Sequence, residues 1–160
     1  MSDRDLGQER QVAPLLLDSL EYVWGRIHDR QQGLTQAEYL WEPVPGCWSV
    51  RQVGDRWQAE RVEPEPMPAP VKTIAWRLSH IGSDILASYT ANGLGHWPLS
   101  VPESSWYGDV TDALMALDQA WEAFRAGLGN LGESGMWRPL GETWGPYAND
   151  AWAALKGLSS

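Results

Sequence analysis

Cysteine, positive charge and long apolar segments are all scarce in this sequence. One cysteine, Cys47, occurs in 160 residues, so the chain cannot form an internal disulfide. The opening residues MSDRDLGQER are charged where a secretory signal peptide needs an apolar core. No segment approaches the roughly 20 apolar residues of a membrane-spanning helix. We therefore expect a cytoplasmic protein without a membrane partner.

Basic residues are outnumbered and scattered. The chain holds 12 Lys and Arg against 21 Asp and Glu, which gives a net charge of −9. Proteins that bind nucleic acid through its phosphates gather basic residues on one surface, so we expect no nucleic-acid partner. Apolar residues make up 43% of the chain and charged residues 21%, a balance typical of a folded domain. At this length we expect one domain over residues 1–160.

Three segments repeat apolar residues at the three- and four-residue spacing of an amphipathic helix. They are 12–32 (Leu16, Leu20, Val23, Trp24, Ile27), about 71–92 (Ile74, Leu78, Ile81, Ile85) and 110–128 (Val110, Leu114, Leu117, Trp121, Phe124, Leu128). A last, short helix is expected after Asn149 or Asp150. These segments predict an all-α helical bundle.

The connection between the first two helices is rich in proline and glycine. Over residues 34–70 these residues exclude a long helix and predict an irregular crossover. Thr35 followed by Glu38 is the pattern of a capping box for one short helical turn, and Ser49 is a second candidate cap.

The second predicted helix carries the residues with the clearest chemical potential. Trp76, His80 and Asp84 follow one another at four-residue spacing, so an imidazole lies one turn from a carboxylate. Two interpretations stay open, a metal or acid–base site and a hydrogen-bonded histidine at the edge of the core. His80 is the main candidate metal ligand, with Asp84 and His28 as weaker ones. Zinc sites usually need three or four protein ligands, and no close His pair occurs here.

Tryptophan is unusually abundant, with eleven copies against one Phe. Four of them are candidates for lining a ligand pocket: Trp24, Trp48, Trp76 and Trp121. The other interpretation is that they pack the core and hold the long loops on it. Cys47 is either a nucleophile or a small residue packed in a turn beside Trp48.

Five segments follow one another in a distinctive order. They are PLLLDSL (14–20), GLTQAEYLWEPVPGCWSVR (33–51), PEPMPAPVKTIAWRLSHI (64–81), DALMALDQAW (112–121) and GPYANDAWAAL (145–155). Together they span nearly the whole chain and resemble actinobacterial members of the DinB-like (DinB/YfiT) superfamily. The resemblance implies an up-down-down-up four-helix bundle, often a homodimer, with a divalent metal at one end. The metal is commonly zinc or nickel, and relatives include thiol-dependent S-transferases, a maleylpyruvate isomerase that uses mycothiol, and metal-dependent hydrolases.

The resemblance also implies which residues hold the metal. In the family one histidine comes from the second helix, at the position of His80, and two come from an H-x-x-x-H arrangement on the fourth. Here the chain ends at Ser160 where relatives continue for about twenty residues. We therefore expect a truncated member with a shortened last helix and an incomplete metal site, so whether it is an enzyme stays open. The catalytic residues are unknown.

A second hypothesis assigns the chain a function of a different class. In this alternative the chain is a non-catalytic module that binds a small ligand or a protein. The binding surface would consist of the loops around Trp41, Trp48, Trp97 and Trp106 and an open groove beside the shortened helix.

Overall fold

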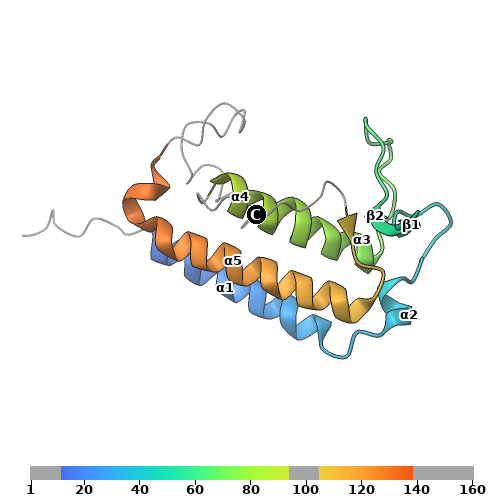
Figure 1. Cartoon of the computed structure of the whole chain (residues 1–160), viewed down its shortest axis with the longest axis horizontal. Coiled ribbons are helices and arrows are strands. Elements are labelled where there is room, and N and C mark those ends of the chain that lie inside the picture. The colour runs from blue at the N-terminus through green and yellow to red at the C-terminus, as the bar shows by residue number, and fades with distance from the viewer. Residues whose placement is uncertain (1–11, 94–104, 139–160) are drawn as a thin grey trace, which may run out of the picture. The chain divides into compact units, whose positions relative to one another are not determined.

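The computed structural model describes residues 12–93 and 105–138 (Figure 1). Its helices are α1 (Val12–Gln31), α2 (Gln36–Tyr39), α3 (Ile74–Ser79), the π-helix η1 (His80–Ala87), α4 (Ser88–Gly93) and α5 (Val110–Met136). Its strands are β1 (Val50–Val53), β2 (Arg56–Ala59) and β3 (Ser105–Trp106). The prediction of a mainly helical chain is confirmed. The all-α prediction is wrong in one respect, because the three strands form a small sheet.

The described residues divide into two compact units. The terminal unit consists of 12–28 and 128–138, and the central unit consists of the remaining described residues. In the terminal unit the backbone N–H of Ala13 donates to Glu133 Oε2 at 3.0 Å. Leu16 and Leu20 are buried as predicted, whereas Val23 is exposed. A single domain over 1–160 stays a prediction.

The helix predicted over 110–128 continues to Met136. Leu117, Trp121, Phe124 and Leu128 are buried, as their spacing predicts. The helical conformation is interrupted only at Gly132, whose φ of 65° lies in the left-handed region that glycine adopts readily. The helix runs past the predicted end at 128 and contains Gly127 and Gly129, because a helix tolerates single glycines at a modest cost.

The capping box at α2 is confirmed. Thr35 Oγ1 accepts from the backbone N–H of Glu38, and Glu38 Oε2 accepts from the N–H of Thr35 at 2.9 Å. The next residue, Gln36, donates from Nε2 to the carbonyl of Gly108 and accepts at Oε1 from the N–H of Val110, both at 2.8 Å. The short helix therefore holds the start of α5 in place.

The crossover predicted as irregular contains a β-hairpin. β1 and β2 pair antiparallel from Val50 opposite Ala59 to Val53 opposite Arg56. The two-residue loop between them begins at Gly54, whose φ of 65° suits a tight hairpin turn. β3 joins the other side of β2. Ser49 precedes a strand rather than a helix, so its prediction as a cap is wrong.

The second predicted helix begins at Ile74 and its buried side is shifted from the prediction. Thr73 caps it by accepting from the N–H of Trp76 at 3.2 Å. Ile74 is exposed, and the buried positions are Ala75, Leu78, Ser79, Gly82, Ser83, Leu86, Ala87 and Thr90. Gly82 on this side lets one aromatic ring approach closely, since a Cβ there would lie 2.5 Å from Trp106 Cη2. The buried face of this helix is therefore determined by the small size of its side chains as well as by their hydrophobicity.

A buried tyrosine links α2 to β3 and to the residue that follows β3. Tyr39 is fully buried, its hydroxyl donates to the carbonyl of Tyr107 at 2.7 Å, and it accepts from Trp106 Nε1 at 3.0 Å. Burial raises the pKa of Tyr39, and the charge of Asp109 adds to the increase, against a smaller opposing effect of the Trp106 hydrogen bond. The hydroxyl therefore remains protonated and keeps donating.

Some predictions lie outside the described residues. These are the last helix after Asn149 or Asp150 and the loop that contains Trp97. The four-helix bundle and the groove beside its last helix consequently stay predictions. Among residues 12–93 and 105–138 no helix is long and apolar enough to span a membrane.

Candidate functional site

The site is centred on His80, the first residue of η1. Its Nδ1 lies 2.8 Å from Asp84 Oδ2, one helical turn away. A neutral imidazole carries one ring hydrogen, and an ionised carboxylate only accepts hydrogen bonds, so the hydrogen resides on Nδ1. The lone pair of Nε2 is then available to accept a proton or to bind a metal. The His80 side chain is 45% exposed, so solutes reach it.

Asp84 is held ionised by its neighbours. Arg61 forms an ion pair with the same Asp84 Oδ2 that His80 contacts. Burial of Asp84 raises its pKa, but the hydrogen bonds from His80 and Arg61 and the charge of Arg61 lower the pKa by more. The pKa of Asp84 therefore lies below its ordinary value. At neutral pH the carboxylate continues to accept from Nδ1.

Trp76 fixes the other side of the imidazole. The indole of Trp76 stacks on the ring of His80, with centroids 5.2 Å apart and 24° between the planes. Trp76 Nε1 donates to the carbonyl of Glu60 at 2.8 Å, which ties the indole to the residue that follows β2. The guanidinium carbon of Arg61 lies 6.0 Å from the Trp76 centroid. The imidazole is thus oriented by a carboxylate and an aromatic face.

A lysine lies in the angle between two indoles. Lys72 Nζ is 5.3 Å from the ring centroid of Trp48 and 5.0 Å from that of Trp76. The two centroids are 6.2 Å apart and their planes are tilted by 33°. Glu65 Oε1 lies 2.5 Å from the same ammonium. We call the space bounded by Trp48, Trp76 and Glu65 the indole notch.

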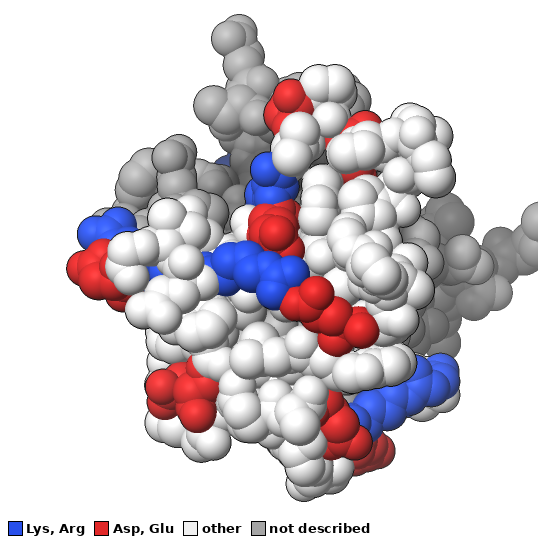
Figure 2. Space-filling model, turned by 90° about the vertical axis from the view of Figure 1, so that its right-hand side faces the viewer, with Lys and Arg blue, Asp and Glu red and all other residues white. Residues whose placement is uncertain are grey.

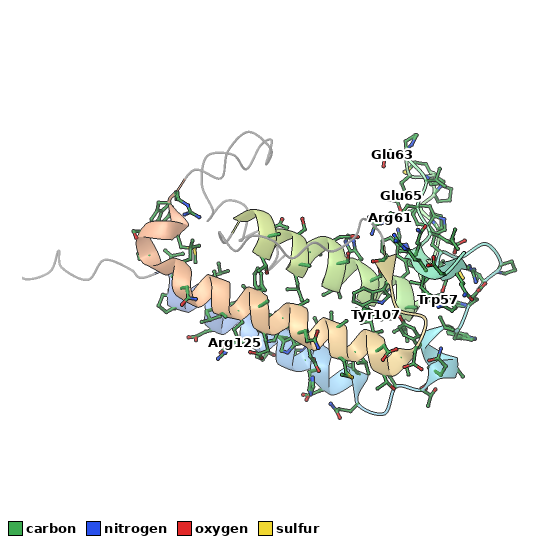
Figure 3. All side chains as sticks on the ribbon, in the orientation of Figure 1. Trp57, Arg61, Glu63, Glu65, Tyr107 and Arg125 are labelled. Carbon is green, nitrogen blue, oxygen red and sulfur yellow. The ribbon has the colours of Figure 1, made fainter. Side chains whose placement is uncertain are left out.

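The segment after β2 carries several of these charged residues. Figure 3 shows Arg61, Glu63 and Glu65 on the loop that projects from the sheet, with Glu63 farthest from the sheet. The base of this loop is fixed at Glu60, whose Oε2 accepts from the N–H of Ser49 at 2.8 Å and from Arg51 Nε at 3.1 Å. Figure 2 shows that basic and acidic side chains adjoin one another on this face. The positive groups are therefore largely paired.

The structure brings some of the predicted site residues together. His80, Asp84, Trp76 and Trp48 form one cluster. Trp121 is buried, with its ring centroid 6.0 Å from that of Phe124. Trp24, half-buried, and His28, exposed, lie on the part of α1 that belongs to the terminal unit. Cys47 is 3% exposed, which favours packing over a role as nucleophile.

Sequence reasoning missed three charged members of the cluster. Lys72 lies before the cap residue Thr73 and pairs with Trp48 in a β-bridge, so the helical spacing of Trp76, His80 and Asp84 does not extend to it. Arg61 lies on the loop and reaches Asp84 of η1 only through the tertiary fold, and Glu65 lies on the same loop and pairs with Lys72, which precedes the helix. No local pattern identifies them.

The donor set of the cluster falls short of a metal centre. Asp84 already accepts from His80 and Arg61, so it orients the imidazole instead of offering a free carboxylate. Within the described residues no group of three His, Cys, Asp or Glu side chains is placed to hold a metal ion. One imidazole does not make a catalytic zinc or nickel site, which takes about three protein ligands.

Comparison of the chain with protein-family models, with curated proteins and with solved structures finds no match in any of the three.

Proposed function

We propose that the chain is a DinB-like helical protein whose functional centre is His80, acting on a small-molecule thiol or on water in S-transfer or hydrolysis. The sequence segments described above support the family, and an up-down-down-up bundle with a shortened last helix is part of the proposal. The observation that carries the proposed chemistry is the 2.8 Å contact between His80 Nδ1 and Asp84.

The proposed chemistry needs a base with a fixed orientation. Nε2 of His80 accepts the proton of a thiol or of water, and the S–H or O–H electron pair stays on the nucleophile, which attacks an electrophilic carbon of the substrate. The bond from that carbon to the leaving group then breaks, its electron pair goes to the leaving group, and the leaving group takes the proton back from Nε2. The imidazolium that forms donates from Nδ1 to Asp84, whose negative charge stabilises it. Trp76 keeps the ring from rotating away.

A divalent metal is a separate part of the proposal. When bound, zinc or nickel would supply Lewis acidity toward a thiol or water. The described donors give His80 as one ligand, so the other ligands would have to come from residues outside the described ranges or from the second copy in a homodimer. Elemental mass spectrometry of purified protein tests this directly. Close to one metal per protomer, lost in His80→Ala, supports it, and no metal above background contradicts it.

Activity measurements test the centre itself. We expect wild-type protein, with zinc or nickel present and absent, to catalyse transfer of a small thiol to an electrophilic aromatic substrate or hydrolysis of an activated ester. His80→Ala should lower the rate by about 100-fold or more, the usual contribution of a general base. His28→Ala is the matched control and should leave the rate unchanged. Equal rates in wild type and His80→Ala would contradict the proposal.

A binding function is the second candidate, and the proximity of Trp48 and Trp76 favours it. Two large aromatic faces beside an exposed imidazole suit a small ligand without any reaction. The two candidates differ in their dependence on His80, since ligand binding that survives His80→Ala in metal-free protein indicates a binding module.

A further inference from the structure

We propose that the indole notch is a binding site for a quaternary ammonium group, and that Lys72 occupies the notch when no such ligand is present. The notch shares Trp76 with the His80 cluster, but ligand binding there needs no chemistry at His80.

The geometry of the notch is that of ammonium recognition. A cation binds well over the face of an indole within about 6 Å of its centroid, and Lys72 Nζ satisfies this distance to both Trp48 and Trp76. The carboxylate of Glu65, 2.5 Å from Lys72 Nζ, completes the charge balance. The Lys72 side chain is only 18% exposed, so the chain keeps an ammonium group largely out of water at this place.

The walls of the notch do not depend on the lysine side chain. The N–H of Trp48 donates to the carbonyl of Val71 at 2.8 Å, and the N–H of Thr73 donates to the carbonyl of Trp48 at 2.9 Å. These two bonds fix the backbone on both sides of Lys72. Trp76 is held by Glu60 and by the stack on His80. Only the flexible side chain of Lys72 has to leave, and the site that remains is already formed.

Hydration of the cation determines which class of ammonium ligand the notch would bind. A primary ammonium is strongly hydrated, so it loses much on leaving water and gains nothing over Lys72 itself. A quaternary ammonium has no N–H to hydrate and presents methyl groups to the indole faces, which is the arrangement that aromatic cages bind. The net charge of −9 favours the approach of any cation.

The test uses tetramethylammonium chloride, titrated into the full chain by calorimetry and by ligand-observed NMR. Sodium chloride at equal ionic strength is the reference. We expect saturable binding to wild type and an upfield shift of the methyl signal, because the methyl groups lie over aromatic faces. Lys72→Ala removes the internal competitor, so the ligand no longer has to displace the Lys72 ammonium from the indoles. The affinity should rise by about fivefold or more, which corresponds to the energy of about one cation–π contact.

Two charge variants on one loop provide the matched comparison. Glu65→Gln removes the carboxylate of the notch and should weaken binding, whereas Glu63→Gln removes an exposed carboxylate two residues away and should not. Equal weakening by both variants would overturn the proposal, because the effect would then be general screening. Absence of binding in both wild type and Lys72→Ala, with unchanged circular dichroism, would also overturn it. Binding by Lys72→Ala alone would show that Lys72 is a permanent structural element, and this too contradicts the proposal.

Discussion

A single carboxylate oxygen of Asp84 interacts with two side chains. Its Oδ2 accepts from His80 and pairs with Arg61, so a single carboxylate connects the loop after β2 to the helix that carries the imidazole. Removal of such a group leaves both partners without an acceptor. At the residue scale, Asp84 is therefore the position whose replacement reports on the whole cluster.

Asp84→Asn should lower the free energy of unfolding by about 1 kcal/mol at neutral pH. This is less than the value for a fully buried charged hydrogen bond, because His80 and Arg61, the partners of Asp84, are partly exposed to solvent. The folded-state pKa lies below the ordinary 3.8. The stabilisation is therefore complete above that pH and is lost as the pH falls through the folded-state pKa. Urea unfolding between about pH 2 and pH 7 measures this. Glu63→Gln is the control, and a wild-type advantage that persists undiminished at the lowest pH would contradict the prediction.

At the scale of elements, the contact between Trp106 and η1 determines which helix face is buried. The indole reaches the helix backbone at Gly82, where any Cβ would be too close to it. β3 is thereby held against the helix at the same level as the His80–Asp84 pair. The π-helical turns of η1 lie at this contact, and π segments frequently occur at functional sites.

Gly82→Ala should destabilise the chain by about 1 to 3 kcal/mol, the usual cost of overpacking. Gly25→Ala is the matched control, because Gly25 lies within α1 and no atom comes within 4 Å of its added Cβ. That variant should be neutral or stabilise the chain by up to about 1 kcal/mol, since alanine is the better helix former. Chemical denaturation of both variants measures the difference. A Gly82→Ala protein as stable as wild type would show that the Trp106 contact relaxes at little cost.

The elements also show how far local patterns predict the structure. Apolar spacing located α1, the 74–93 helical run and α5, and the Thr35–Glu38 pattern located α2, because each signal lies within one continuous helical segment. The hairpin was missed although Gly54 and Asp55 separate two short runs that suit strands. The spacing of Ile74, Ile81 and Ile85 predicted the wrong buried face for the second helix. The face that is buried contacts Trp106, which is distant in the sequence. Arg61 was missed for the same reason, because its partner Asp84 lies 23 residues away.

At the scale of the whole molecule, charge is the dominant property. The chain carries 12 basic residues against 21 acidic ones, and Arg51, Arg61 and Lys72 are each paired with a carboxylate. A surface of this kind repels the phosphates of a nucleic acid. It also leaves few Lys and Arg side chains to replace the counterions that are bound along the phosphate backbone.

We expect no binding to a 20-base-pair DNA duplex at physiological salt, with protein up to about 10 μM, because non-specific affinity comes from released counterions. Fluorescence anisotropy of labelled duplex measures it, and a basic DNA-binding protein is the positive control. Micromolar binding that weakens steeply with salt would show that basic residues gather on a surface formed in the assembled protein.

Cys47 gives the molecule a built-in reporter. It is the only thiol in the chain, it is almost completely buried, and the next residue forms one wall of the indole notch. A thiol reagent can modify it only when this part of the central unit opens, so the alkylation rate in native buffer measures local opening without any introduced label. A ligand that fills the notch would slow the modification in proportion to its occupancy. Protection of one natural cysteine would then serve as a binding assay on the unaltered protein.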